Sequence, residues 1–490
     1  MEFSGGDRIM LNIIIFGTGS SAQKFVDMID PTKVNILCFV DNDTSKQSKK
    51  FGDKYINAPH KIQEFRYDYI VIASQYSNEI MEQLLRMGIK HDRIIPFDYE
   101  FHNKNNEEYY KKVHGLMIKD KKKYNQRFKI ALINYNYSNY NGSSLYKYMP
   151  DFIKAKYDVE LVTSIDKEYL SKFDVICSSH YDGIYNGFHL NFEMWHGFPI
   201  KLLGAMQKTV SERSIEYYRN RSKHTDLVFS YSQLYTTIFN SCFPSHAEKY
   251  RITGMPRNDL LFEEGSLNKL EKLCKRNLSN YNIVFYLPTW RKGKNEVIET
   301  SNEWNKLFGF KNEKTEIVKD IIEKNNLFLV VKLHPFEFNK YKNLEIFKHD
   351  RVFLLSEDIL LEYKIHLYEL MGCCKVLITD YSSIFFDTLL IDTPLIFAPT
   401  DLDEYNENRG FLLEPYDYLT PGPTVSTLEE LEMELRKLLN QQDEWRDKRK
   451  QVKKLVFKYY DNKSSLRVWT EIDNYLSSQV FGDCFGDKTR

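Results

Sequence analysis

The chain has 490 residues, which is more than one hydrophobic core ordinarily serves, so we expect several domains. Its 68 basic and 68 acidic residues cancel, so no nucleic-acid partner is predicted. No apolar run approaches the ~20 residues that span a bilayer, and no secretory signal begins the sequence. Seven cysteines without a CxxC spacing indicate a reducing cytosol, and no HExxH or paired Cys/His set predicts a metal site.

The N-terminal part of the chain predicts a small Rossmann-like domain. Strands are predicted at residues 11–16, 34–40 and 69–73. Gly17, Gly19 and Ala22 approximate the G-x-G-x-x-G/A turn of dinucleotide-binding folds, and Asp41 ends the second strand, where an acidic residue meets a ribose. We therefore assign residues 10–105 to an accessory domain, with Gly17, Gly19 and Asp41 as its candidate cofactor-binding residues and no ligand identified. The alternative is that these glycines serve only the close packing of strand and helix.

A polar segment at residues 106–127 is predicted to be a linker. Its basic run, Lys119–Lys123, is by default a solvated group of charges. The sharper alternative is a surface that touches anionic lipid.

Beyond the linker, apolar strands alternate with helices in two further units. The predicted strands are 129–134, 157–163, 173–178, 192–195, 283–286, 327–333, 352–355, 376–378 and 395–397. This alternation favours parallel, doubly wound sheets. The predicted fold class is therefore α/β, a GT-B-like pair of Rossmann-like domains that face a cleft. We place the pair at residues 128–250 and 251–425, followed by C-terminal helices at 426–490.

The stretch Lys375–Pro394, KVLITDYSSIFFDTLLIDTP, carries the strongest local signal. A buried strand at 376–378 leads into a polar turn with Asp380, and Ser382 and Ser383 begin a helix whose apolar residues recur at helical spacing. Such a turn presents backbone N–H groups and the positive end of a helix dipole to an anion. The alternative is that Ser382 only caps the helix.

The segment Met194–Gly204, MWHGFPIKLLG, follows a short predicted strand and contains His196 and Lys201. Imidazole titrates near neutral pH, so His196 can take a proton from a hydroxyl. Lys201 supplies a cation suited to phosphate. The alternative is a structural histidine whose hydrogen bonds are satisfied inside the fold.

Three further segments carry cations at predicted strand ends or turns. Arg257 either forks onto phosphate or pairs with Asp259 at the surface. Arg291 follows a strand in YLPTWR, either at the site or as a solvated loop charge. Lys332 and His334 end the run LFLVVKLHP on the same side of the strand, which suits a pyrophosphate; the alternative is that Lys332 only caps the sheet. Ligands of open α/β sheets bind outside the carboxyl ends of the strands, so we expect one common cleft.

As a set, these motifs resemble the CDP-glycerol glycerophosphotransferases, which build teichoic acids and related phosphate-linked capsule polymers. The matching pieces are WHGFPIKLLG, GMPRNDLLF, YLPTWR, KLHP, LITDYSSIFFD and the segment from Pro394 through Asp401, Tyr405, Arg409 and Gly410 to Pro421–Pro423. They occur in the family's order and cover about residues 128–475. The N-terminal domain departs from the family's catalytic core and resembles small modules found beside sugar-modifying enzymes, which leaves a role in capsule synthesis open.

The resemblance implies a GT-B enzyme that passes a polyol phosphate from CDP-glycerol, or a related CDP-polyol, to a hydroxyl of a lipid-linked acceptor and releases CMP. Residues 128–250 would bind the acceptor and residues 251–425 the donor. It makes His196 the general base and adds His334 to the catalytic residues. The implied substrate-binding residues are Lys201, Arg257, Arg291, Lys332, Asp380, Ser382, Ser383 and Asp387. No cofactor is expected, and the resemblance implies peripheral work at the cytoplasmic face of the bacterial membrane.

Two other functions remain open at this point. A GT-B glycosyltransferase that uses a nucleotide sugar needs the same fold and a similar phosphate site. A catalytically inactive nucleotide-binding scaffold of a polymer-export complex would tolerate the loss of His196. Release of CMP, of UDP or of neither nucleotide separates the three.

Overall fold

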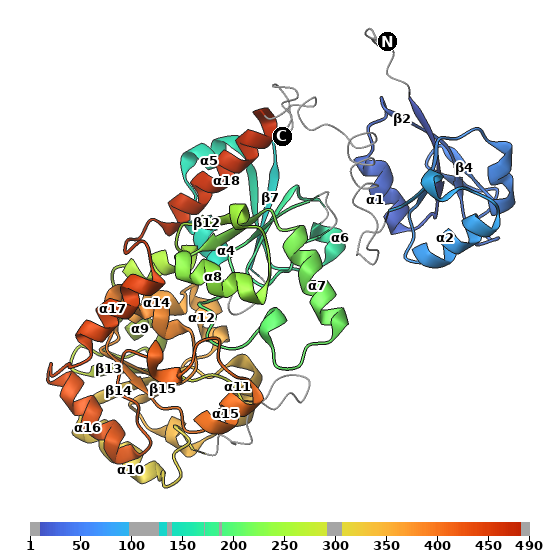
Figure 1. Cartoon of the computed structure of the whole chain (residues 1–490). Coiled ribbons are helices and arrows are strands. Elements are labelled where there is room, and N and C mark those ends of the chain that lie inside the picture. Colours follow the sequence, from blue (N-terminus) through green and yellow to red (C-terminus); the bar gives the residue numbers. More distant parts are fainter. Residues whose placement is uncertain are drawn as a thin grey trace. The chain divides into compact units, whose positions relative to one another are not determined.

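The computed structural model describes residues 10–97, 127–134, 140–170, 172–185, 189–291 and 306–481. The chain divides into two compact units, Met1–Phe128 with Ile184–Leu190 and Lys129–Gly183 with Asn191–Arg490 (Figure 1). The predicted basic run Lys119–Lys123 lies outside the described residues, as does the predicted linker except for residue 127.

The first unit is built on one six-stranded sheet with the order β3-β4-β2-β1-β5-β6. Its elements are β1 (Leu11–Phe16), α1 (Ser20–Met28), β2 (Val34–Val40), β3 (Lys50–Phe51), β4 (Lys54–Asn57), η1 (Pro59–Glu64), β5 (Tyr69–Ile72), α2 (Ser77–Arg86), η2 (His91–Arg93) and β6 (Ile94–Pro96). All pairs are parallel except the β3–β4 hairpin. The central strands β1 and β5 are almost wholly buried, because helices cover a parallel sheet on both faces. The predicted Rossmann-like fold of this unit is confirmed.

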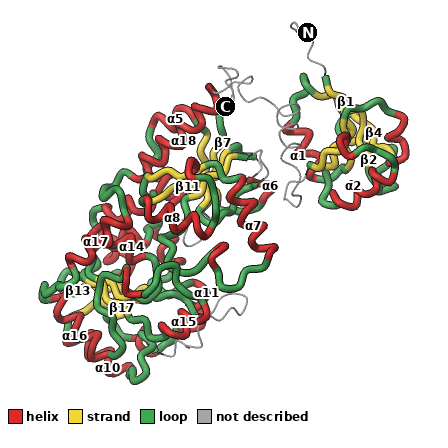
Figure 2. The backbone as a smooth tube through the Cα atoms, in the orientation of Figure 1, coloured by secondary structure: helices red, strands yellow, loops and turns green. Residues whose placement is uncertain are grey.

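The second unit contains two parallel sheets, drawn in yellow between red helices in Figure 2. The N-terminal sheet has the order β12-β11-β10-β9-β7-β8. Its strands are β7 (Lys129–Ile133), β8 (Asp158–Val162), β9 (Val175–Ser178), β10 (Leu190–Glu193), β11 (Leu227–Ser230) and β12 (Tyr250–Ile252). The last two were not predicted, and β12 pairs with β11. The predicted boundary at residue 250 is therefore too early, since the chain leaves this sheet only after Ile252.

The C-terminal sheet has the order β15-β14-β13-β16-β17, and all five of its strands match predicted ones. They are β13 (Asn282–Leu287), β14 (Leu327–Val331), β15 (Val352–Leu354), β16 (Val376–Thr379) and β17 (Leu395–Phe397). The central β14 and β16 are buried throughout, as their unbroken apolar sequences predict. One face of the sheet shares a hydrophobic core with α10 (Thr315–Lys324) and α16 (Leu428–Leu439).

The remaining helical segments of the second unit connect and cover these sheets. They are α4 (Tyr140–Lys147), α5 (Asp151–Lys156), α6 (Lys167–Leu170), η4 (Gly204–Met206), α7 (Glu212–Lys223), α8 (Gln233–Cys242), η5 (Ala247–Lys249), η6 (Pro256–Phe262), α9 (Ser266–Cys274), α11 (Pro335–Tyr341), η7 (Glu345–Lys348), α12 (Glu357–Tyr363), α13 (Leu367–Leu370), η8 (Met371–Cys373), α14 (Ile384–Thr388), η9 (Leu389–Ile391), α15 (Leu402–Asn408), η10 (Tyr416–Tyr418), α17 (Arg446–Val456) and α18 (Ser464–Phe481).

The last helix, α18, returns to the N-terminal half of this unit and lies beside α5 (Figure 1). The indole Nε1 of Trp469 donates to the carbonyl oxygen of Leu145 at 3.0 Å. The α18 start is capped by Asp259, whose carboxylate accepts from the amides of Ser464 (2.9 Å) and Ser465 (2.7 Å). The C-terminal helices are therefore shared between the two halves, because α16 packs on the C-terminal sheet and α18 on the other.

Within the described parts of the chain, no helix has the length and apolar character to cross a membrane.

Candidate active site

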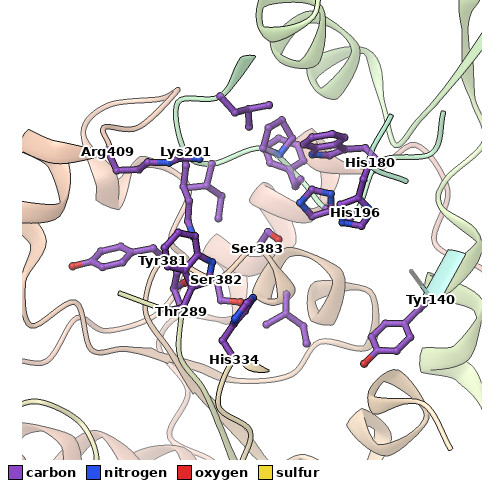
Figure 3. A pocket seen from close by; sticks show the side chains of 18 of the residues that line it. Tyr140, His180, His196, Lys201, Thr289, His334, Tyr381, Ser382, Ser383 and Arg409 are labelled. Atoms are coloured by element: carbon purple, nitrogen blue, oxygen red, sulfur yellow. The ribbon is translucent and has the colours of Figure 1, made fainter. Parts of the chain in front are cut away.

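A cleft of about 650 Å³ lies where the carboxyl ends of the strands of both sheets meet. Seven of the predicted site residues line it: His196, Lys201, Arg257, Lys332, His334, Ser382 and Ser383. The N-terminal wall also carries His180, and the C-terminal wall carries Thr289 (Figure 3). The convergence expected from the strand ends is therefore present in the second unit.

His196 lies just beyond β10 and is held in one orientation. Its Nδ1 lies 3.1 Å from the carbonyl oxygen of Ser179. A carbonyl only accepts hydrogen bonds, so the ring proton is on Nδ1 and the lone pair is on Nε2. The ring stacks on His180 with centroids 4.2 Å apart and contacts Trp195 at 4.3 Å. Burial, together with the nearby cations, lowers the pKa of His196 to about 4, so the ring is neutral at pH 7.

Glu193 orders the two loops that carry the stacked rings. Its buried carboxylate accepts hydrogen bonds from the Ser178 hydroxyl, the Tyr181 amide (2.9 Å) and the Trp195 amide (2.8 Å). Burial raises the pKa of Glu193 to about 7. Trp195 has a φ of +47°, a strained conformation for a residue other than glycine. Glu193 was not predicted from the sequence, where the available signal was an acidic residue at the end of an apolar strand.

His334 follows β14, and its ring carries the proton on Nε2, whereas that of His196 carries it on Nδ1. It precedes α11, and its Nδ1 accepts the backbone N–H of Phe336 at 3.2 Å. The proton of the neutral ring is therefore on Nε2, which makes that nitrogen a donor. Burial and the charges of Lys332 and Lys201 lower the pKa of His334 to about 3.

Two lysines flank His334 in the cleft. Lys332 pairs with Glu357, with Nζ 2.5 Å from Oε1, so its charge is balanced within the C-terminal wall. Lys201 lies on a segment that pairs with the C-terminal half of the unit. The Leu202 amide donates to the Gly410 carbonyl at 3.1 Å, and the Leu412 amide donates to the Ile200 carbonyl at 2.8 Å. This short antiparallel contact fixes the two walls at one edge of the cleft.

Ser382 and Ser383 lie on the C-terminal wall of the cleft, and Ser383 contacts the N-terminal wall at Gly197. The helix after them, α14, has only five residues and continues as the 3₁₀ turn η9, so its dipole is smaller than predicted. Ser383 is the N-cap residue, but its side chain makes no cap hydrogen bond. A Cβ on Gly197 would lie 2.5 Å from Ser383 Oγ, so the glycine is required by this close approach.

Arg257 joins the cleft to a buried carboxylate. Its Nη2 lies 2.6 Å from Oδ2 of Asp387, and its Nη1 donates to the carbonyl oxygen of His196. Asp387 also accepts from the hydroxyls of Tyr231 (2.8 Å) and Tyr368 (2.6 Å). The predicted alternative, a surface pair of Arg257 with Asp259, is wrong, because Arg257 is buried and Asp259 caps α18.

Arg291 lies behind the cleft wall. Its guanidinium binds Asp401 through two hydrogen bonds of 2.6 and 3.0 Å and lies 2.8 Å from Asp380. Arg291 and Asp380 are each 1% exposed. Arg291, Asp380 and Asp387, which were predicted to bind substrate, are buried ion-paired residues that do not line the described cleft, and their substrate contact stays a prediction. The Asp380 carboxylate instead holds the cleft residue Thr289 through its amide at 2.8 Å.

In the first unit, the predicted cofactor-binding residues meet at the end of β1. Gly17 has a φ of +117°, and a Cβ there would lie 2.4 Å from the Ala73 carbonyl oxygen, so packing requires this glycine. The Thr18 hydroxyl donates to Asp41, which also accepts from the Asp43 amide at 2.9 Å. Gly19 is the N-cap residue of α1 and is exposed. A cofactor role for Gly17, Gly19 and Asp41 stays a prediction.

Two family models match the chain. One, described as CDP-Glycerol:Poly(glycerophosphate) glycerophosphotransferase, covers residues 186–474 and therefore more than half of the sequence. The other, C2185-like, N-terminal, covers residues 9–95 and corresponds to the additional domain.

Curated relatives carry teichoic acid names. A Bacillus spizizenii teichoic acid poly(glycerol phosphate) polymerase is 26% identical over 62% of this chain and 82% of its own length. A Staphylococcus aureus teichoic acid glycerol-phosphate transferase is 26% identical over 48% of this chain and 58% of its own length. The Staphylococcus aureus teichoic acid ribitol-phosphate polymerase TarL is 26% identical, over 49% of this chain and 41% of its own length.

Solved structures of the wall teichoic acid polymerase TagF share the fold. One has a TM-score of 0.56 at 20% identity and covers 72% of this chain and 90% of TagF. Another, a variant soaked with CDPG, has a TM-score of 0.58 at 19% identity and covers 82% and 98%. The predicted GT-B-like architecture is thereby confirmed. With its family model spanning residues 186–474, the chain belongs to the CDP-glycerol:poly(glycerophosphate) glycerophosphotransferase family and carries an extra N-terminal domain.

Proposed function

We propose that this chain transfers glycerol phosphate, or a related polyol phosphate, from its CDP-activated form to a hydroxyl of a polymer acceptor and releases CMP. The observation that carries the proposal is the pair of histidines in one cleft with opposite ring protons. His196 presents a lone pair on Nε2, and His334 presents an N–H on Nε2. Transfer of a phosphoryl group to a hydroxyl needs one acceptor of a proton and several donors to phosphate oxygens.

His196 is the proposed general base. The acceptor hydroxyl oxygen forms a bond to the β-phosphorus of the donor, and its proton passes to Nε2 of His196. The bond from the β-phosphorus to the oxygen shared with the α-phosphorus breaks, and its electron pair leaves with CMP. General-base assistance of this kind contributes roughly 10²–10⁴-fold in rate.

Donor binding makes His196 a stronger base. Arg257 and Lys201 are among the groups that lower its pKa in the free protein. Burial is the main cause of the lowered pKa, and the two negative charges of a bound diphosphate offset only the part that these cations contribute, so the pKa of His196 is higher when the donor is in place. Proton removal is thereby favoured in the donor complex.

The C-terminal wall is the proposed site for the diphosphate. Lys332 supplies a cation, and His334 Nε2 and the hydroxyls of Ser382 and Ser383 supply hydrogen-bond donors in the same cleft. These groups stabilise the charge that develops on departing CMP. Arg291 and Asp380 act behind the wall by holding the β13 loop, as the Asp380–Thr289 contact indicates.

The acceptor is proposed to be lipid-linked, with the enzyme attached peripherally at the cytoplasmic face of the membrane. Family membership supports this placement, because teichoic acid polymers are the products named for the relatives. The polyol is open to test, since both glycerol-phosphate and ribitol-phosphate polymerases are among those relatives.

A donor screen tests the function. Purified protein is incubated with acceptor-bearing membranes and CDP-glycerol, CDP-ribitol or UDP-sugars, and the nucleotide released is identified by chromatography. We expect CMP from a CDP-polyol, and no release above background with His196→Ala. Release of UDP would establish a glycosyltransferase instead, and no release with any donor would favour the inactive scaffold.

A further inference from the structure

The two ends of the cleft differ in chemistry. The end formed by the C-terminal half of the unit carries the polar groups assigned to the diphosphate. The end formed by the N-terminal half is aromatic. Phe243 is central to it, with ring centroids 5.2 Å from Trp195, 5.0 Å from Tyr181 and 5.4 Å from Tyr218. All four rings line the cleft.

Arg221 on α7 brings a positive charge to this aromatic end. Its guanidinium carbon lies 3.3 Å from the ring centroid of Tyr217, and its Nε donates to the carbonyl oxygen of Tyr181 at 3.2 Å. Both side chains line the cleft. A guanidinium stacked on an aromatic ring is held in one plane, with its fork of donors oriented for phosphate oxygens.

We propose that this aromatic end is the acceptor subsite, and that Arg221 binds the last phosphodiester of a polyol-phosphate chain whose terminal hydroxyl reaches His196. The inference rests on the proposed function and adds the residue, Arg221, that recognises the charge of the acceptor. It assigns this chain to extension of an existing phosphodiester polymer rather than to addition onto an uncharged sugar.

The in-line geometry of phosphoryl transfer supports an acceptor subsite at the aromatic end of the cleft. In phosphoryl transfer the attacking and leaving oxygens lie roughly in line, so the acceptor approaches from the side opposite the leaving CMP. With the diphosphate on the C-terminal wall, the attacking hydroxyl comes from the His196 side. Trp195 contacts His196 and also Phe243, so the aromatic surface begins directly beside the base.

Charge matching points to a phosphodiester. The donor diphosphate carries two negative charges. Lys201, Lys332 and Arg409 line the described cleft at that end, whereas the charge of Arg257 is paired with buried Asp387. A phosphodiester carries one negative charge, and Arg221 is the cation that α7 contributes to that lining. Every completed transfer leaves one phosphodiester a single polyol unit away from the new terminal hydroxyl. A growing chain therefore presents the same charge at the same place in each cycle.

The test compares two acceptors that differ by one phosphodiester group. Octyl glycerophosphoglycerol has one phosphodiester before its terminal glycerol, and the octyl diglycerol ether has none. With CDP-glycerol as donor and CMP release as the readout, Arg221→Ala should raise KM for the charged acceptor by roughly tenfold to a hundredfold, the usual loss for a charged hydrogen bond. Its kcat, its KM for the uncharged acceptor and its affinity for a non-reacting CDP analogue should stay within about twofold of the wild-type values. Arg221→Lys should recover part of the loss.

Matched variants separate charge recognition from folding. Arg219→Ala removes an exposed arginine two residues earlier on the same helix and should behave as wild type. Tyr217 is 50% exposed, so Tyr217→Ala should fold and should raise the KM for the charged acceptor less than Arg221→Ala does. An Arg221→Ala enzyme that loses both acceptors equally, or neither, overturns the acceptor assignment while the transferase function stands. A wild-type enzyme that releases no CMP with either acceptor, or with membranes, overturns the function and the subsite together.

Discussion

Each wall of the cleft carries a buried histidine, and the two rings bear their protons on different nitrogens. On the N-terminal wall, a backbone carbonyl fixes the proton of His196 on Nδ1; on the C-terminal wall, a backbone amide fixes the proton of His334 on Nε2. Burial keeps both rings neutral, since both pKa values lie well below that of free imidazole. The proposed roles, proton acceptor for His196 and hydrogen-bond donor for His334, therefore depend on one hydrogen bond to each ring and not on residue type.

The supports of the two walls also differ. His196 is held by ring stacking on His180 and Trp195 and by a buried carboxylate, Glu193, which binds three groups of the two loops. Behind the C-terminal wall, the guanidinium of Arg291 is enclosed by two carboxylates. The N-terminal wall therefore orients one reactive ring, whereas the C-terminal wall holds several donors in a fixed frame.

The largest effect on activity is expected from loss of His196, the proposed general base on the N-terminal wall. His196→Ala should lower kcat by at least about a hundredfold, because general-base assistance disappears while the diphosphate groups remain. Affinity for a non-reacting CDP analogue, measured by calorimetry, should be retained. His246→Ala, at an exposed histidine outside the cleft lining, is the matched control. Full activity of the His196 variant would remove the base assignment.

Substitution of Arg291, which lies behind the C-terminal wall, should lower the free energy of unfolding. Arg291→Ala leaves two buried carboxylates without their cation and should lower the free energy of unfolding by about 3–5 kcal/mol. Tryptophan fluorescence in urea follows the second unit alone, because all five tryptophans lie beyond residue 128. Arg276→Ala, which breaks an exposed pair with Asp350, should cost less than about 1 kcal/mol. Wild-type stability of Arg291→Ala with lost donor affinity would restore Arg291 to the phosphate site.

The pH dependence of kcat/KM should reflect the lowered pKa of His196. A base with a depressed pKa stays neutral, and therefore active, until the pH falls through that lowered value. We expect kcat/KM for the donor, which reports the free enzyme, to show no limb from His196 between about pH 8 and 5 and to fall about tenfold per pH unit below about pH 4, where His196 is protonated. Enzyme returned to pH 7 after each assay should regain full activity, which excludes acid unfolding. A limb near pH 6.5 that is also present in Glu193→Gln, which removes the buried carboxyl with a pKa of about 7, would contradict the burial of His196 or its role.

The smallest expected change concerns a single donor on the C-terminal wall. Lys332→Ala should weaken binding of a non-reacting CDP analogue by about tenfold, because one charged contact is lost. Glu357→Gln is the matched variant: it removes the partner of Lys332 and should leave the affinity unchanged or increase it. Unchanged affinity of the Lys332 variant would displace this lysine from the diphosphate site.

Strand ends were the part of the site that sequence patterns could predict. His196, Lys332, His334 and Ser382 each follow a recognisable apolar strand, and all four line the cleft. The same rule applied to the strand ending at Ser178 would have found His180. Arg291 also follows a strand, but the two carboxylates that enclose it come from other segments, so its sequence neighbourhood gave no sign of its burial.

The alternation of strands and helices, the family and the set of strand ends that carry polar groups were determined by the sequence alone, because hydrophobic period and strand-end chemistry are local properties. Strands β11 and β12 were recognised only in the structure. Which cations face the cleft and which histidine nitrogen bears the proton were decided only by the tertiary structure. Those properties depend on partners that folding brings together: Asp401, which lies 110 residues from Arg291, and the Ser179 carbonyl, which lies 17 residues from His196.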